Sequence, residues 1–120
     1  MELTVSEAAA RVRLSVHTLR WYEEVGLLDP IGRDGIGRRR YVERDIARLE
    51  FLNRLRSTGM SVRDMRRYVD LVRQGPATAA ARQELLLAHR EHVLNRIADL
   101  QRDLGVIEYK IKLYESKELT

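Results

Sequence analysis

Five side chains in one short stretch carry the groups with which proteins contact nucleic acids. They combine an imidazole, a hydroxyl, a guanidinium and two aromatic rings: His17, Thr18, Arg20, Trp21 and Tyr22. Such groups can contact base edges in a DNA groove or donate to phosphate oxygens. At helical spacing, Val16, Leu19 and Glu23 fall on the other side, which can pack inward. Because short amphipathic helices with a few basic residues are common, the neighbouring sequence decides how this stretch is interpreted.

A second basic cluster follows a glycine-rich turn. Residues 32–37 contain three glycines and an aspartate, a composition typical of a turn. The extended residues after it predict a hairpin, or wing, with Arg38 and Arg40 on one face and Arg39 and Tyr41 on the other. Three consecutive arginines beside a candidate recognition helix favour phosphate contact. The alternative is a flexible loop with solvated arginines.

Two short helices are expected to position the first cluster. Ser6 is predicted to cap a helix over residues 6–12 and Ser15 the helix that follows, because a serine hydroxyl can accept from a free N–H of the first turn. Gly26 tolerates positive φ and is expected to end the second helix. Two short helices joined by a tight turn predict a helix-turn-helix, with the second as the recognition helix.

Two further helices are expected to supply the core. Apolar residues recur every three positions across residues 45–56, and a 3-4-3 apolar stripe follows across residues 61–73. The core residues predicted from these patterns are Ile46, Leu49, Leu52, Leu55, Val62, Met65, Val69 and Val72. Residues 1–75 therefore predict a winged helix-turn-helix domain in a mainly α-helical chain.

The remaining residues, 76–120, predict one long dimerisation helix with a short tail. A helix over residues 77–115 would be about 58 Å long. Its apolar residues keep the spacing of a coiled-coil seam: Leu86, Val93, Ile97, Leu100, Leu104, Ile107, Ile111 and Tyr114. Such a stripe needs cover from another chain, most simply a second copy. Arg90 also occupies a seam position, which has three interpretations. It faces the partner's N-terminal module, it marks the start of the seam, or it is a solvated arginine at a frayed end.

The charge is concentrated where the nucleic-acid candidates lie. The 120 residues carry 22 Lys and Arg against 18 acidic residues, a net charge of +4. Residues 1–76 contribute 15 Arg against 11 acids, whereas residues 77–120 are neutral. Nineteen of the cations are Arg, which suits bidentate contact with phosphate or guanine. Part of that excess fits solvated helix faces equally well.

Several function classes find no support in the composition. The chain has no cysteine, which excludes disulfides, thiolate metal sites and thiol redox chemistry. Its apolar runs are too short to span a bilayer, and its N-terminus lacks the layout of a signal peptide. We therefore expect a soluble cytoplasmic protein without membrane contact.

No cofactor, metal or enzyme activity is expected. His89 and His92 lie three residues apart on the predicted long helix, but two imidazoles alone make an incomplete metal site. Polar residues flanking the seam are the favoured interpretation of this pair. The spacing reveals no catalytic triad, phosphate-binding glycine loop or pair of buried carboxylates.

The segment over residues 15–28 resembles the recognition-helix signature of the mercury-resistance regulator (MerR) family. Residues 37–41 are similar to that family's wing, and residues 45–49 and 55–62 follow at the family's spacing. The resemblance covers essentially the whole chain. It implies an antiparallel coiled coil that sets two recognition helices apart on a palindromic site. Many family members add a ligand-binding domain or metal-binding cysteines, and this chain resembles the short members without them.

Carried over by position, the resemblance implies base or phosphate contacts at His17, Thr18, Arg20 and the Trp21–Tyr22 pair, and wing contact at Arg39. This sequence departs from the family at three positions. His17 stands where Arg or Lys is frequent, and Arg38 replaces an aromatic residue. Val42 replaces a capping serine, so Val42→Ser is expected to stabilise the protein by about 1 kcal/mol.

The function expected from these features is that of a MerR-type transcriptional regulator. As the resemblance implies, a homodimer would bind double-stranded promoter DNA at a palindromic operator and bend and untwist an over-long spacer for RNA polymerase. One alternative is an architectural DNA-binding protein without promoter switching. Another is a coiled-coil adaptor whose basic module binds an acidic protein. A small molecule could bind where the coil meets the helix at residues 61–73, although no polar group there indicates one.

Overall fold

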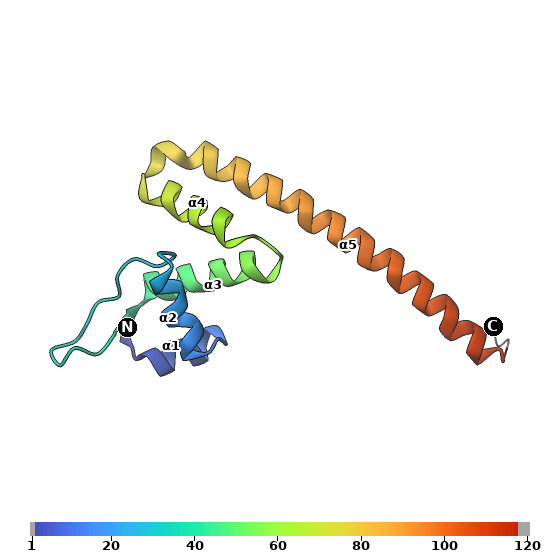
Figure 1. Cartoon of the computed structure of the whole chain (residues 1–120), viewed down its shortest axis with the longest axis horizontal. Coiled ribbons are helices and arrows are strands. Elements are labelled where there is room, and N and C mark those ends of the chain that lie inside the picture. The colour runs from blue at the N-terminus through green and yellow to red at the C-terminus, as the bar shows by residue number, and fades with distance from the viewer. Residues whose placement is uncertain (1, 118–120) are drawn as a thin grey trace. The chain divides into compact units, whose positions relative to one another are not determined.

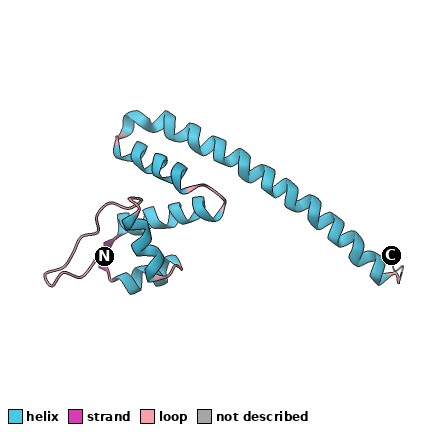
Figure 2. Ribbon diagram, in the orientation of Figure 1, coloured by secondary structure: helices cyan, strands magenta, loops and turns pink. Residues whose placement is uncertain are grey.

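The computed structural model describes residues 2–117 and divides the chain into two compact units, which meet between Ala79 and Ala80. The first unit holds three short helices, one longer helix and a two-stranded sheet (Figures 1 and 2). The second unit is a single long helix. The predicted domain boundary at residues 75–76 falls at the start of the 3-10 turn η1 (Pro76–Thr78), a few residues before this division.

The two N-terminal helices are set by their capping residues. Helix α1 (Val5–Val12) begins after Thr4, whose hydroxyl accepts from the Glu7 N–H while the Glu7 carboxylate accepts from the Thr4 N–H. The prediction of Ser6 as the cap was therefore wrong, because the threonine two residues earlier completes a reciprocal capping box. Helix α2 (Val16–Glu24) is capped by Ser15 as predicted, with a bond of 3.0 Å from the Thr18 N–H.

Gly26 ends α2 in the way the sequence predicts. Its φ of +81° lies in the left-handed region. The Gly26 N–H donates to the Glu23 carbonyl and the Leu27 N–H to the Tyr22 carbonyl, the pair of bonds that closes a helix at a glycine. Leu27 and Leu28 then turn directly into the core, where both are buried.

Helices α3 (Glu43–Ser57) and α4 (Val62–Arg73) complete the first unit. Ile46, Leu49, Leu52 and Leu55 of α3 are buried at the predicted three-residue spacing. Met65 and Val69 of α4 are also buried, whereas Val62 and Val72 are half-buried. The apolar periodicity in the sequence therefore identifies the main core residues of both helices.

A two-stranded antiparallel sheet closes the base of the wing. Strand β1 (Glu2–Leu3) pairs with β2 (Tyr41–Val42), so that Glu2 lies opposite Val42 and Leu3 opposite Tyr41. Further out, Arg33 and Arg39 form an isolated antiparallel bridge. The predicted hairpin is therefore present, and we call residues 32–40 the wing.

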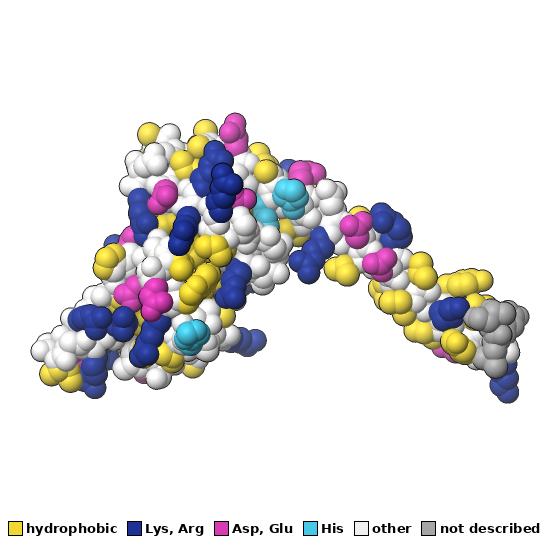
Figure 3. Space-filling model, viewed as in Figure 1, with side chains coloured by type: hydrophobic (Ala, Val, Ile, Leu, Met, Phe, Trp, Pro, Cys, Tyr) yellow, Lys and Arg dark blue, Asp and Glu magenta, His cyan; other side chains and the backbone are white. Residues whose placement is uncertain are grey.

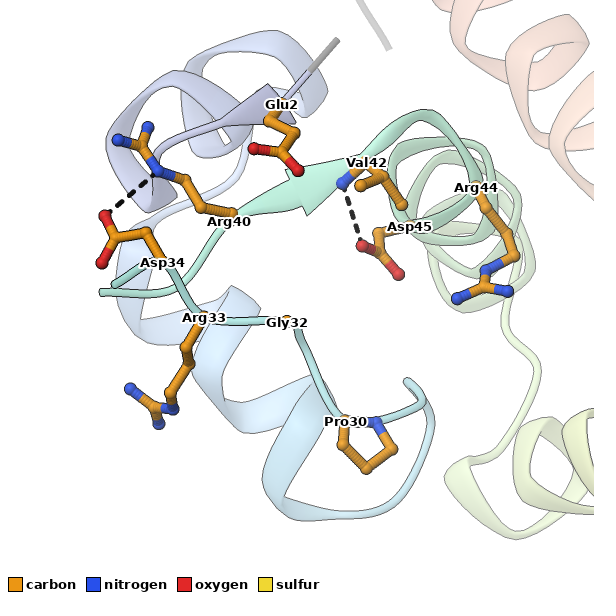
Figure 4. Close-up of a pocket in the computed structure, with 9 residues that line it drawn as sticks. All are labelled: Glu2, Pro30, Gly32, Arg33, Asp34, Arg40, Val42, Arg44 and Asp45. Carbon is orange, nitrogen blue, oxygen red and sulfur yellow. Dashed lines mark hydrogen bonds and ion pairs between the residues drawn. The ribbon is translucent and has the colours of Figure 1, made fainter. Parts of the chain in front are cut away.

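Val42 is the N-cap of α3 and makes no side-chain capping bond. The Asp45 carboxylate accepts from the Val42 N–H at 3.0 Å (Figure 4), which supplies half of a capping box. Valine has no acceptor with which to return the bond. The backbone N–H groups in the first turn of α3 therefore lack the hydrogen bond that a serine at position 42 could accept.

Helix α5 (Ala79–Glu115) has 37 residues, none of them buried. It starts two residues later than predicted, because Pro76–Thr78 forms the turn η1. Leu86 and Val93 are half-buried, and the other six predicted seam residues are exposed. Apolar side chains are visible along the C-terminal part of this helix (Figure 3). Within residues 2–117, no helix combines the length and apolarity needed to cross a membrane.

Candidate nucleic-acid interface

Helix α2 presents most of the predicted contact residues on its outer surface. His17 and Arg20 are exposed, and Thr18 and Trp21 are half-buried. The hydroxyls of Ser15 and Thr18 lie 2.8 Å apart, which holds the Thr18 side chain against the cap. The helix thus offers an imidazole, a guanidinium and an indole at the surface. We refer to His17, Thr18, Arg20 and Trp21 as the α2 surface.

The structure corrects the sequence-based expectation for Tyr22 and Tyr41. Both side chains are fully buried, so neither ring can lie against a DNA surface. Tyr22 follows Leu19 by three residues and shares its inward face, and Tyr41 pairs in the sheet opposite Leu3. In the described part of the chain, neither hydroxyl has a hydrogen-bond partner. Burial raises the pKa of the Tyr41 hydroxyl above its ordinary value of 10.0, and the Glu23 carboxylate acts in the same direction.

The wing arginines alternate as predicted. Arg38 and Arg40 lie on one side and share the Oδ2 atom of Asp34, at 3.2 Å and 3.4 Å from their Nε atoms. Figure 4 draws the Arg40–Asp34 pair. Arg38 remains largely exposed, whereas Arg40 is about a quarter exposed. One carboxylate therefore offsets part of the basic charge that the sequence places in the wing.

Arg39 points to the other side of the wing and reaches the recognition helix. Its Nε donates to Glu23 Oε1 at 2.8 Å, and both side chains are largely buried. This bond spans sixteen residues of sequence and ties the wing to α2. The sequence placed Glu23 on the inward side of the helix but gave no partner for it. A carboxylate on an otherwise apolar helix face is the signal that could have indicated an ion pair.

Asp34 shapes the tip of the wing. Its Oδ1 accepts from the backbone N–H groups of Ile36 and Arg38, each at 3.0 Å. The bond from the Arg38 N–H is the main reason that the pKa of Asp34 lies below its ordinary value. The Arg33 guanidinium donates to the Gly37 carbonyl at 2.7 Å. These bonds hold the turn in a defined conformation, which argues against a flexible loop.

Three further arginines connect α2 and the loop that follows it to α3 and α4. The Arg56 guanidinium carbon lies 5.3 Å from the centre of the Trp21 ring, within cation–π range. Arg66 Nε donates to the Val25 carbonyl at 2.9 Å, and Arg73 Nε donates to Asp29 at 2.9 Å. The residues in each pair are far apart in sequence, so periodicity alone could not identify these contacts.

A cavity of about 430 Å³ lies beside the wing (Figure 4). Its lining mixes arginines with carboxylates: Glu2, Pro30, Gly32, Arg33, Asp34, Arg40, Val42, Arg44 and Asp45. The acids lie among the arginines, so the lining does not favour an anion. Among residues 2–117, no group of three or more His, Cys, Asp or Glu side chains could hold a metal ion.

Comparison with protein-family models gives two matches. A model described as "MerR HTH family regulatory protein" matches residues 3–71. A second model, described as "MerR, DNA binding", matches residues 46–104. Together they cover the recognition helix, the wing and much of the long helix.

Individual proteins are similar over most of the chain. An uncharacterised HTH-type transcriptional regulator from Haemophilus influenzae is 36% identical over 115 residues, which cover 96% of this chain and 85% of that protein. The HTH-type transcriptional regulator AdhR from Bacillus subtilis is 34% identical over 92 residues, which cover 77% of this chain and 66% of that protein.

Solved structures of MerR family regulators are also similar to this chain. The structure of HiNmlR, a MerR family regulator lacking the sensor domain and bound to promoter DNA, superposes with a TM-score of 0.90 at 36% identity, covering 96% of this chain and 87% of that one. A MerR family transcriptional regulator from Bacillus thuringiensis gives a TM-score of 0.84 at 28% identity, covering 93% and 98%.

Proposed function

The chain belongs to the MerR family of helix-turn-helix regulatory proteins, and we propose from this premise that it binds operator DNA within a promoter as a homodimer. The chain is a DNA-binding transcription regulator. The related HiNmlR was solved bound to promoter DNA. We assign it a regulatory and not a catalytic role, carried out in the cytoplasm where promoter DNA is accessible.

The observation that supports DNA binding most strongly is the α2 surface together with the wing beside it. His17 and Arg20 are exposed on a helix whose opposite face is buried through Leu19 and Tyr22. The Arg39–Glu23 bond holds the wing against this helix. A helix with donors on its outer face can enter the major groove, while an adjacent basic wing contacts the backbone. Arg38, with most of its side chain exposed, could meet a phosphate in addition to Arg39.

The exposed seam of α5 supports the homodimer. Ile97, Leu100, Leu104, Ile107 and Ile111 are each about half exposed in the single chain. The helix is about 56 Å long. The apolar residues along one of its faces can be removed from water only by packing against another surface. A second copy of the same helix offers a seam of matching spacing. As the family resemblance implies, an antiparallel pair would place two recognition helices on the half-sites of a palindrome.

The regulatory step that we propose is a change in DNA shape. The dimer would bend and untwist a promoter spacer so that RNA polymerase can engage both promoter elements. Deforming a duplex over this length costs a few kcal/mol, which phosphate contacts distributed over two subunits can offset. RNA polymerase is therefore the second macromolecular partner in this proposal.

Footprinting of the intergenic DNA next to the gene, with and without RNA polymerase, tests the proposal. Protection of a single palindrome inside a promoter spacer, with altered reactivity at its centre, is the expected result. Scattered protection would instead indicate an architectural DNA-binding protein. If no duplex binds even at low salt, the proposal fails and an adaptor for an acidic protein replaces it.

A further inference from the structure

Two charged side chains of α5 have no partner within the single chain. Arg96 and Asp103 are exposed, and in the described residues neither side chain makes an ion pair or a hydrogen bond. The two charged residues between them, Asp99 and Arg102, instead pair with each other at 3.1 Å. Charged side chains of both signs are visible along this helix (Figure 3). Arg96 and Asp103 therefore remain available to a second chain.

Both charges lie beside the seam. Arg96, Asp103 and Lys110 each directly precede a seam residue and follow one another at intervals of seven residues. At this spacing they lie along one edge of the seam, where charges select the partner and the orientation of a coiled coil. In a two-fold antiparallel pair, this edge faces the same edge of the second chain. The register then decides which charges meet.

The charges of α5 favour an antiparallel pair over a parallel one. A parallel pair in register would place Arg90 of the seam against the partner's Arg90, and Asp103 beside the partner's Glu108. Both contacts join like charges. An antiparallel pair separates the two copies of Arg90 to opposite ends of the seam, where the long side chain can reach water. This direction is also the one that the family resemblance implies.

Apolar contacts alone leave two antiparallel registers equally good. In one register Ile97 lies opposite the partner's Leu100. Its other apolar pairs are Val93 with the partner's Leu104 and Leu86 with the partner's Ile111. A shift of one heptad places Leu100 opposite the partner's Leu104 and forms the same number of apolar pairs. Burial of the seam therefore does not distinguish these two registers.

The charges beside the seam do distinguish them. In the first register Arg96 faces the partner's Asp103, and by symmetry this ion pair forms twice. In the shifted register Arg96 faces the partner's Lys110, and Asp103 faces the partner's Asp103. A shift of one heptad in the other direction brings Arg96 against the partner's Arg96. A shift of two heptads pairs Asp103 with the partner's Lys110, but it leaves Leu86 and Val93 without apolar partners.

Resting on the proposed homodimer, we propose that α5 recognises a second copy of this chain through two symmetric ion pairs between Arg96 and the partner's Asp103. These pairs fix the antiparallel register in which Ile97 lies opposite the partner's Leu100. The apolar seam drives the association, and the ion pairs select the register and the partner. A regulator with a similar seam but another order of charges along this edge would meet like charges and pair less well.

Charge exchange in the full chain tests the ion pairs. Arg96→Asp places two carboxylates opposite each other, and Asp103→Arg places two arginines opposite each other. Each variant homodimer should therefore dissociate with a constant about tenfold higher than that of the wild type, measured by sedimentation equilibrium. Arg102→Asp is the matched control, because it makes the same charge change away from the seam, and it should dimerise like the wild type.

Two combinations should restore the ion pairs. The chain that carries both Arg96→Asp and Asp103→Arg should dimerise like the wild type. In an equal mixture of the two single variants, native mass spectrometry should find more heterodimer than the statistical half of all dimers. Stronger dimerisation of Arg96→Asp would overturn the proposal, because it is the result expected where Arg96 faces the partner's Lys110. Equal dimerisation of all variants would overturn it too.

Disulfide formation locates the register directly, because the chain has no cysteine of its own. Val93→Cys chains mixed with Leu104→Cys chains should form linked heterodimers, since these positions face each other in the proposed register. Val93→Cys chains mixed with Ile111→Cys chains, which face each other one heptad away, should link far less. The reverse preference would overturn the register alone. A wild-type chain that stays monomeric would refute the proposed homodimer and the register with it.

Discussion

Arg39 of the wing donates from its Nε to Oε1 of Glu23 on the recognition helix, across 2.8 Å. The pair is largely buried, with the arginine side chain 28% and the glutamate 20% exposed. In the described residues the bond engages only Nε of the guanidinium, which leaves the terminal nitrogens able to donate to a phosphate. We therefore propose that Glu23 both anchors the wing and orients Arg39 for contact with a phosphate.

Glu23→Gln should weaken DNA binding about fivefold, even though it removes a negative charge from the DNA-binding side. Glu24→Gln is the matched control, since Glu24 is the neighbouring acid and is exposed. That variant should bind as well as the wild type or slightly better. Titration of a fluorescent duplex measures both, and tighter binding by Glu23→Gln would show that the pair only restrains Arg39.

Arg39→Ala should weaken binding and flatten the slope of log K against log salt by about one unit, because one phosphate contact is lost. The measurement is a series of duplex titrations at increasing salt. An unchanged slope with weaker binding would mean that Arg39 acts only by holding the wing in place.

Arg20→Ala should cost about 1–3 kcal/mol of binding free energy and reduce discrimination between operator sequences if Arg20 contacts a base. Arg102→Ala is a suitable control, because Arg102 is an exposed cation on α5 that pairs with Asp99 three residues before it. Competition titrations with operator variants measure the discrimination. Equal losses on all sequences would reassign Arg20 to a phosphate.

Tyr22→Phe and Tyr41→Phe should each leave DNA binding unchanged and stabilise the fold by about 1 kcal/mol. Both hydroxyls are buried without a hydrogen-bond partner in the described chain, and removing an unsatisfied buried group is favourable. Chemical denaturation gives the stability and duplex titration the affinity. Weaker DNA binding by either variant would restore the tyrosine as a contact residue.

The same burial predicts a loss of stability in alkali. Because burial raises the pKa of Tyr41 above 10.0 in the folded chain, the unfolded chain loses this proton first as the pH rises. The contribution of Tyr41 to the free energy of unfolding should therefore be constant below about pH 10 and fall above it. The free energy of unfolding of Tyr41→Phe should fall less steeply over that range. Denaturation at a series of pH values measures it.

Val42→Ser should be more stable than Val42→Ala by about 1 kcal/mol, because only serine can accept from the first turn of α3. Both variants remove the branched side chain from β2, so their difference isolates the capping bond. Thermal unfolding compares them. Equal stability would show that the half box supplied by Asp45 already satisfies this helix start.

Helix starts, helix ends and buried helix faces could be predicted from the sequence where interactions between nearby residues determine them. Ser15, Gly26 and the three-residue spacing in α3 depend on capping, positive φ and burial of one helix face, and each is where the pattern placed it. Thr4 was missed because Ser6, two residues later, is the residue type more often found at an N-cap. Only Glu7, which completes the capping box with Thr4, distinguishes them.

The candidate site was less predictable because its contacts join distant segments. Tyr22 and Tyr41 are aromatic residues of the kind that often contact DNA. The packing of α2 and of the sheet instead buries both side chains in the core. The Arg39–Glu23 pair and the Arg66 bond to Val25 span 16 and 41 residues. No sequence periodicity indicates pairs so far apart, so these contacts could be identified only from the three-dimensional structure.

We propose that two chains join through the α5 seam, and the mass of the protein in solution reveals whether they do. Sedimentation equilibrium should give twice the 14.0 kDa mass of the chain. Ile107→Arg, on the seam, should give monomers that bind the duplex weakly. Val106→Arg, at the adjacent exposed position off the seam, should remain a dimer. A wild-type protein that sediments as a monomer at all concentrations would rule out the proposed homodimer.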